Sequence, residues 1–242
     1  MSQSNKKTKI AAMADIHVGM NSQNTFKDLF LEISDKADVL LLCGDLTYSG
    51  QADEAKVLAN ELTNCRIPVV AVLGNHDYDM GHHQEIREAI SNENVTILDG
   101  DHITVNDIGF AGTIGFAGGF DKYMLNSFGE APIKQFVQEA VNEQLKLERA
   151  LSQLETKKKV VLLHYAPIRH TVVGEPTEIW PFLGSSRLLE PIENFEVNAV
   201  FHGHAHLGTY EGKTPKGTPV YNVAMPIMQK INEKQPYALI EV

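Results

Sequence analysis

Five short apolar segments of this chain each end in a residue type that commonly binds metal ions. In chain order, the residues that follow these segments are Asp15, Asp45, Asn75, His164 and His204. The segments are rich in Val, Leu, Ile and Ala, and their length is typical of buried strands. Ligands of open α/β sheets bind beyond the carboxyl ends of the strands. The five side chains are therefore expected to meet at one edge of the fold.

Helical patterns alternate with these apolar segments, which predicts β-α-β units and largely buried, mixed or parallel sheets. The predicted strands are 9–14, 39–43, 68–73, 95–98, 102–105, 109–111, 160–163, 197–201, 220–224 and 237–241, and the predicted helices are 24–36, 53–62 and 131–156. The last two strands lie in a turn-rich region and are expected to form antiparallel hairpins. The whole pattern predicts an α/β sandwich of two mixed sheets with helices outside, in a single domain spanning residues 1–242.

Charge and hydropathy exclude several classes of protein. The net charge of −10 argues against an extended grip on nucleic acid, which needs a basic surface. No apolar stretch is long enough to predict a membrane span. The basic start, MSQSNKKTK, is not followed by the apolar segment of a signal peptide, so the cytoplasm is the expected location. Cys43 and Cys65 are expected to be small core residues rather than a disulfide.

The spacing of the polar residues indicates a metal centre. His204 and His206 are two residues apart, so their side chains face the same way on extended backbone. Asp15-x-His17 taken alone could also be an aspartate in a turn followed by a surface histidine. A glycine precedes Asp45 and His204, as it does Asn75, and permits close backbone approach. Six to eight nitrogen and oxygen ligands without a thiolate suit two ions of Mn, Fe or Zn. Two divalent ions, two carboxylates and a bridging hydroxide would leave a cationic centre that suits a phosphate.

The order of these motifs resembles the signature of the calcineurin-like metallophosphoesterases. Asp-x-His, Gly-Asp, Gly-Asn-His-Asp, a single His and Gly-His-x-His follow one another from residue 15 to residue 206. The resemblance implies a four-layer αββα sandwich and hydrolysis of a phosphodiester or phosphomonoester at two divalent or trivalent metal ions that share a bridging hydroxide. It implies a first metal on Asp15, His17, Asp45 and His206, a second on Asn75, His164 and His204 with Asp45 as the bridge, and His76 as the group that contacts phosphate and assists the leaving oxygen.

One departure from the family pattern concerns the segment after Asp45. The protein Ser/Thr phosphatases of this superfamily carry a second aspartate there that pairs with the catalytic histidine, whereas residues 44–50 contain no second acid. A protein phosphatase is therefore disfavoured. Asp77 could orient His76 instead, or it could cap backbone groups, and the sequence leaves both open.

Several other residues have two interpretations each. Arg169 could clamp phosphate, with His170 beside it, or be a surface charge. His202 could contact substrate or be a packed strand residue, and Trp180 could stack on a base, although packing is favoured. The histidines at 82 and 83 could line the mouth of a pocket or simply start a helix. The glycine-rich stretch 112–129 could be a mobile lid or an irregular, packed connection.

Three functions are open to a chain with these residues. The first is a phosphoesterase acting on a small phosphorylated substrate, nucleotides included. The second is a non-catalytic protein-interaction module on the same fold, which the retention of every motif residue disfavours. The third is a nuclease or a sugar-nucleotide pyrophosphatase. A nuclease needs a basic groove and a pyrophosphatase acting on lipid-linked substrates needs an apolar entry, and the sequence shows neither clearly.

Overall fold

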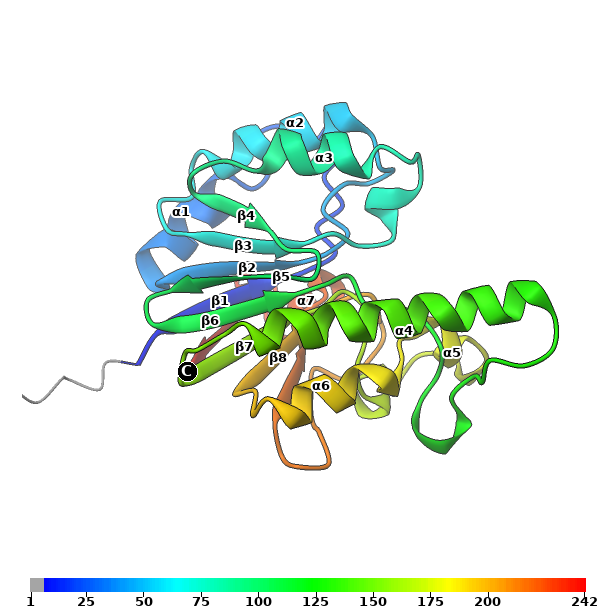
Figure 1. Ribbon diagram of the computed structural model, residues 1–242. Coiled ribbons are helices and arrows are strands. Elements are labelled where there is room, and N and C mark those ends of the chain that lie inside the picture. The colour runs from blue at the N-terminus through cyan, green and yellow to red at the C-terminus, as the bar shows by residue number, and fades with distance from the viewer. Residues whose placement is uncertain (1–6) are drawn as a thin grey trace, which may run out of the picture.

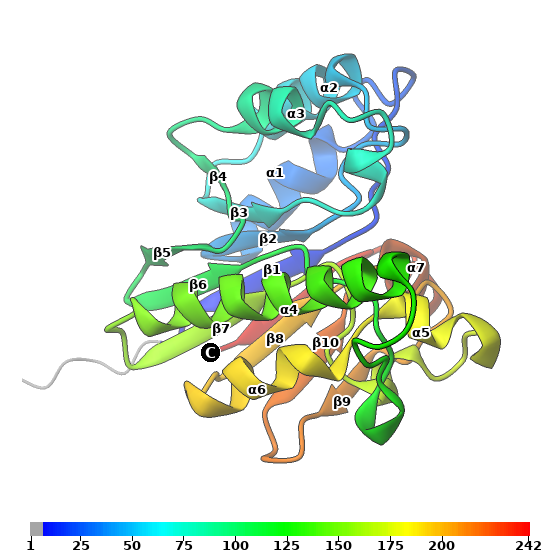
Figure 2. The same cartoon turned by 45° about the vertical axis from the view of Figure 1, so that its right-hand side comes forward.

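Two β-sheets pack face to face between two layers of helices in the computed structural model, which describes residues 7–242 (Figure 1). The order of the layers is helices, first sheet, second sheet, helices, and a view turned by 45° shows the same arrangement (Figure 2). The predicted α/β sandwich of two mixed sheets is therefore confirmed. The first six residues of the basic start lie outside the described residues.

The first sheet contains five strands in the order β11-β1-β2-β3-β4. Its strands are β1 (Lys9–Met13), β2 (Val39–Cys43), β3 (Val69–Val72), β4 (Val95–Ile97) and β11 (Ala238–Glu241). The first four run parallel, and β11 is antiparallel to β1. Its outer face is covered by α1 (Lys27–Lys36), α2 (Ala52–Leu62) and α3 (His83–Ile90). Because both faces of this sheet are covered, β2 is apolar throughout instead of alternating.

The second sheet contains six strands in the order β5-β6-β7-β8-β10-β9. Its strands are β5 (Asp101–Val105), β6 (Ile108–Gly112), β7 (Lys158–Leu162), β8 (Ala199–His202), β9 (Glu211–Lys213) and β10 (Pro219–Asn222). Strands β6, β7, β8 and β10 are parallel, with an antiparallel strand at each edge. Helices α4 (Ala131–Ser152) and α6 (Leu189–Asn194) cover its outer face (Figure 2).

The core between the sheets is built from alternate residues of the strands. On β2, Val39, Leu41 and Cys43 face the second sheet, whereas the residues between them face the helices. From the second sheet, Phe110 and Phe201 pack into the same layer and are fully buried. Cys43 and the equally unpaired Cys65 are buried, as expected for small core residues.

The first helix starts later than predicted, at Lys27 rather than at residue 24. Asn24 has a positive φ of 60°, which no helix tolerates in its interior. The buried carboxylate of Glu61, on α2, accepts hydrogen bonds from the backbone N–H groups of Asn24 and Phe26 at 2.6 and 2.9 Å. Hydrogen bonds between Glu61 and the segment before α1 thus fix this boundary, and the local pattern of the sequence does not reveal them.

The expectation of antiparallel hairpins for the last two predicted strands is confirmed for β10 and wrong for β11. Strand β10 lies parallel to β8 in the second sheet, and its antiparallel partner is the short β9. Strand β11 lies in the other sheet beside β1. Helix α7 (Met225–Ile231) follows β10 and precedes β11 in the sequence, and the chain returns through it to the first sheet (Figure 1). The sequence pattern did not predict this helix.

The glycine-rich stretch 112–129 is fixed to the fold in its first half. Gly118 and Gly119 donate backbone hydrogen bonds to Pro181 and Gly184, and Phe120 is buried. The second half is exposed, with Phe128 73% accessible. The interpretation as a packed connection therefore holds for residues 112–120. Among residues 7–242, none of the helices is long and apolar enough to cross a membrane.

The packing between the sheets predicts the cost of a cavity there. Phe110→Ala is expected to lower the free energy of unfolding by about 3–5 kcal/mol, because the truncated ring leaves a void that the surrounding strands cannot close. Phe128→Ala is the matched control, since this exposed ring leaves no void, and its effect is expected to stay within about 0.5 kcal/mol. Urea unfolding followed by circular dichroism measures both, and equal effects would contradict the assigned core.

Candidate metal and phosphate site

The polar residues that follow the strands lie together at one edge of the sandwich. Two groups of side chains each bring their ligand atoms within 4.8 Å of one another. The first group is Asp15, His17, Asp45 and His206, and the second is Asp45, His164 and His204. Asp45 belongs to both groups. The expected convergence of the strand ends from both sheets is therefore what the structure shows.

Short distances connect the members of both groups. Asp15 Oδ1 lies 2.9 Å from His206 Nε2. The two carboxylate oxygens of Asp45 face different histidines, with Oδ2 at 3.8 Å from His17 Nε2 and Oδ1 at 3.4 Å from His164 Nε2. The amide oxygen of Asn75 lies 2.8 Å from His164 Nε2, so Asn75 adds an oxygen donor to the second group.

Four of these side chains sit on backbone that non-glycine residues rarely adopt. The φ angles are +57° at Asp15, +43° at His17, +50° at Asp45 and +70° at His204. Each such conformation costs about 1–3 kcal/mol and persists only where the surrounding structure enforces it. These conformations lower the stability of the fold but turn the four side chains toward a common point. Backbone strain of this kind is concentrated at functional sites.

Two glycines let the backbone come close to the carboxylates. A Cβ at Gly74 would overlap the carboxylate and backbone nitrogen of Asp45, and a Cβ at Gly203 would overlap Asp15 Oδ2. Neither position has room for alanine without displacing a carboxylate of the site. The close approach expected of the glycines that precede Asn75 and His204 is confirmed.

The electrostatics of the cluster favour bound cations. Asp15 and Asp45 are 3% and 1% exposed, and within residues 7–242 their ion-pair partners are histidines, without a lysine or arginine. Buried carboxylates without a fixed cation are unfavourable unless they are paired or bind a metal. The Nδ1 nitrogen of His17 is also buried without a hydrogen-bond partner in the described part of the chain. The donor set therefore fits metal ions.

The pKa shifts are consistent with this interpretation. Burial opposes ionisation of Asp15, but the hydrogen bond from His206 and the charges of His164 and His206 hold its pKa below the usual value. The same hydrogen bond raises the pKa of His206. Burial lowers the pKa of His17, and it lowers that of His204 to about 3. His17 and His204 are therefore neutral at physiological pH, which is the form of imidazole that binds metals.

Backbone carbonyls orient the histidines of the second group. The Nδ1–H of His164 donates to the carbonyl of Cys43 at 3.1 Å, which leaves the lone pair of Nε2 toward Asp45. The Nε2–H of His204 donates to the carbonyl of Phe182 at 3.2 Å, which leaves Nδ1 free for an ion. Such hydrogen bonds fix the tautomer and orientation of metal-binding imidazoles.

His76 stands beside the first group without belonging to it. Its ring centre is 4.6 Å from that of His17, and its Nδ1 lies 2.8 Å from the carbonyl of Tyr48. The carboxylate of Asp79 lies 3.7 Å from the same nitrogen. The sequence does not predict either contact. Any residue could supply the backbone carbonyl at position 48, and an acid three residues after His76 forms no distinctive motif.

Asp77 is a backbone cap. Its buried carboxylate accepts hydrogen bonds from the N–H groups of Leu46, Thr47 and Gly74, at 2.8–3.1 Å, and from the hydroxyl of Thr47. None of its hydrogen bonds within residues 7–242 goes to the ring of His76. Of the two interpretations that the sequence left open, the structure shows the capping one, and Asp77 ties together the loops that present Asp45 and Asn75.

The residues with uncertain roles lie in different surroundings. Arg169 stacks its guanidinium over Trp180 at 5.1 Å, and the indole of Trp180 donates to the carbonyl of Glu175. His170 is exposed and borders Lys213 on β9. His202 is fully buried, its ring nitrogens lie 2.8 Å from the carbonyl of Gly203 and the hydroxyl of Thr171, and burial lowers its pKa to about 4. Buried in this way, His202 supports the loop that carries His204.

The close approach at Gly203 yields a direct test. Gly203→Ala is expected to weaken Mn²⁺ binding by about tenfold or more, because the added methyl group displaces Asp15. Gly19→Ala is the matched control, since a Cβ there meets its nearest neighbour at an ordinary 3.7 Å. Titration calorimetry with Mn²⁺ distinguishes the two variants. An unchanged affinity in Gly203→Ala would contradict the assignment of Asp15 as a ligand.

Solved structures share this architecture. Phosphopantetheinyl hydrolase from Mycobacterium tuberculosis superposes with a TM-score of 0.67 at 13% identity, covering 97% of this chain and 96% of that one. The protein TT1561 of Thermus thermophilus gives a TM-score of 0.57 at 12% identity, covering 98% and 99%. A Staphylococcus aureus protein named as a candidate 5′-nucleotidase gives 0.52 at 15% identity, covering 90% and 48%. Because the sequence identities are only 12–15%, these structural similarities establish the fold and nothing more.

The sequence comparisons differ in what they find. No curated protein matches the chain. The model of the calcineurin-like phosphoesterase family matches residues 8–208, a range that contains both ligand groups and His76. The chain therefore belongs to the calcineurin-like phosphoesterase family.

Proposed function

We propose that this protein hydrolyses a phosphoester of a small molecule at a centre of two metal ions. The observation that carries the proposal is the position of Asp45, whose two carboxylate oxygens face histidines of different groups. A carboxylate shared in this way is suited to hold two ions next to each other. The family membership supports phosphoester hydrolysis as the class of reaction.

Each ion would have its own set of ligands. Asp15, His17 and His206 would hold the first ion and Asn75, His164 and His204 the second, with Asp45 between them. All donors are nitrogen or oxygen, which suits Mn, Fe or Zn. When bound, the two ions activate water and stabilise phosphoryl oxygens in an in-line displacement. Two divalent ions carry four positive charges against two carboxylates, so the site would be cationic and attract phosphate even though the protein is acidic.

His76 is suited to proton transfer to the leaving oxygen. The carbonyl of Tyr48 accepts the hydrogen bond from Nδ1–H and so points Nε2 away from it. The ring is partly exposed, with 38% of the side chain accessible, and lies against His17. An imidazole in such a position can hydrogen-bond a phosphate and hand a proton to the alkoxide that departs. This role needs no metal bond to His76.

The substrate is expected to be small. The net charge of −10 disfavours long nucleic acid. The structural neighbours bear the names of a phosphopantetheinyl hydrolase and a candidate 5′-nucleotidase, and both names refer to small phosphorylated molecules. These names support a small phosphorylated substrate here without selecting between a monoester and a diester.

Two substitutions separate metal binding from proton transfer. His76→Ala is expected to lower kcat by about 10²–10⁴-fold while Mn²⁺ binding stays intact. Asp45→Ala is expected to lose both activity and at least one bound ion, because it removes the shared ligand. Chelator-treated protein should be inactive and should regain activity with Mn²⁺.

The assay uses bis(4-nitrophenyl) phosphate and 4-nitrophenyl phosphate, with metal content measured in parallel. His102→Ala, on edge strand β5, is the matched histidine control and should behave as the parent protein. Full turnover in both His76→Ala and Asp45→Ala would reject the proposed function.

A further inference from the structure

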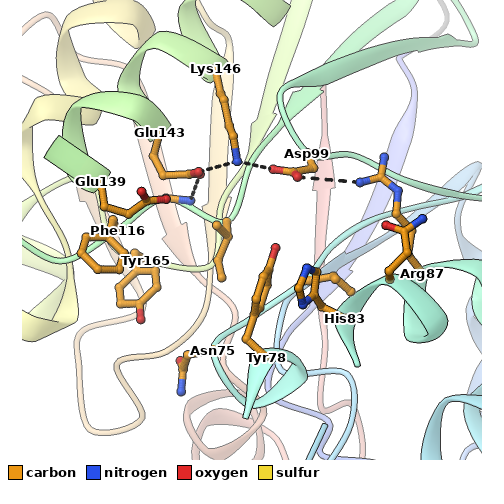
Figure 3. A pocket seen from close by; sticks show the side chains of 14 residues that line it. Asn75, Tyr78, His83, Arg87, Asp99, Phe116, Glu139, Glu143, Lys146 and Tyr165 are labelled. Carbon is orange, nitrogen blue, oxygen red and sulfur yellow. Dashed lines mark hydrogen bonds and ion pairs between the residues drawn. The ribbon is translucent and has the colours of Figure 1, made fainter. Parts of the chain in front are cut away.

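A cavity of about 440 Å³ opens beside the second ligand group, between α3 and α4 (Figure 3). Asn75 belongs to its wall, and so does Tyr165, whose ring centre is 4.4 Å from that of His204. The volume lies in the range of pockets that bind small organic molecules. None of the roles assigned above uses this cavity.

Aromatic side chains form two facing walls of the cavity. On one side, Tyr78 and His83 are stacked, with ring centres 4.4 Å apart and planes inclined by 18°. On the other side are Phe116 and Tyr165, with ring centres 5.9 Å apart and planes inclined by 50° (Figure 3). The ring of Phe136 packs on Phe116 at 5.0 Å between centres. A flat aromatic group in the cavity would have rings on either side to stack on, and neighbouring rings already hold them in place.

Both cations of the cavity lining, Arg87 and Lys146, are paired with carboxylates. Lys146 Nζ lies 2.7 Å from Glu143 and 2.9 Å from Asp99. Arg87 lies 3.9 Å from Asp99 and pairs more closely with Asp101, at 3.2 Å. With Glu139, the lining carries three carboxylates against the two cations Arg87 and Lys146. A second phosphate would find no uncompensated cation here, so the lining suits a group without negative charge.

A polar group remains at the aromatic wall. Burial raises the pKa of Tyr78 to about 12, so its hydroxyl stays neutral and can both donate and accept a hydrogen bond. A flat ligand with hydrogen-bonding atoms along its edge can pair with this hydroxyl.

We propose that this cavity binds the nucleobase of a nucleoside phosphate whose phosphoester lies at the metal ligands. The inference rests on the proposed function for the placement of the phosphate, whereas the cavity itself concerns only the organic part. A nucleobase is flat, uncharged and edged with donors and acceptors, which are the three properties that the walls, the charge pairing and the Tyr78 hydroxyl favour. A flexible aliphatic chain would gain little from two rigid aromatic walls.

The test measures binding of free nucleosides, which carry no phosphate and need no metal. Adenosine and uridine are titrated into the full chain and followed by ligand-observed NMR and calorimetry, with pantetheine as the aliphatic competitor. At least one nucleoside is expected to bind. Phe116→Ala is expected to weaken that binding by about fivefold or more, because stacking on one ring is lost. Phe128→Ala, at an exposed ring outside the cavity lining, is the matched control and should leave nucleoside binding unchanged.

The outcomes separate this proposal from the proposed function. Binding of pantetheine but of neither nucleoside, no binding of any of the three at millimolar concentration, or equal binding by Phe116→Ala and the parent protein would overturn the nucleobase assignment. Hydrolysis of the nitrophenyl esters does not depend on the cavity. Ester hydrolysis without nucleoside binding would therefore reject only the cavity proposal, and nucleoside binding without ester hydrolysis would reject only the proposed function.

Discussion

The burial of two carboxylates without a fixed counter-cation is the constraint on which the rest of this site depends. Asp15 and Asp45 are almost inaccessible, and histidines are their ion-pair partners within residues 7–242. A charge in such a place is costly unless an ion compensates it. The surrounding structure nevertheless holds both groups firmly, by the backbone N–H of His204 toward Asp15 and that of His76 toward Asp45. The fold thus maintains a negative centre that divalent ions are suited to fill.

The architecture explains how distant segments reach this centre. Four parallel strands of one sheet and four of the other carry their carboxyl ends to the same edge, so the loops after β1, β2, β3, β7 and β8 meet there. The left-handed backbone at Asp15 and Asp45 turns the side chains inward. The buried carboxylate of Asp77 joins two of these loops. The stability that the packed core provides therefore compensates for the strained backbone at Asp15 and Asp45.

The sequence predicted the sandwich and the convergence of the strand-end side chains, because apolar strands followed by Asp, Asn or His are local patterns that can be recognised along the chain. It could not predict contacts formed between segments. The start of α1 depends on Glu61 from another helix, and the placement of β11 depends on α7, which has little periodic signal over its short length. The carbonyls of Tyr48, Cys43 and Phe182, which orient three histidines, are invisible to any side-chain pattern. The aromatic cavity likewise depends on tertiary packing, because residues of α3 and α4, far apart in the sequence, line it together.

The most direct test of the central claim is the location of metal in crystals grown with Mn²⁺, observed by anomalous scattering at a wavelength sensitive to manganese. The account predicts two peaks, one on each side of the Asp45 carboxylate, with Asp15 beside one and Asn75 beside the other. A single peak, or peaks that do not contact Asp45, would contradict it.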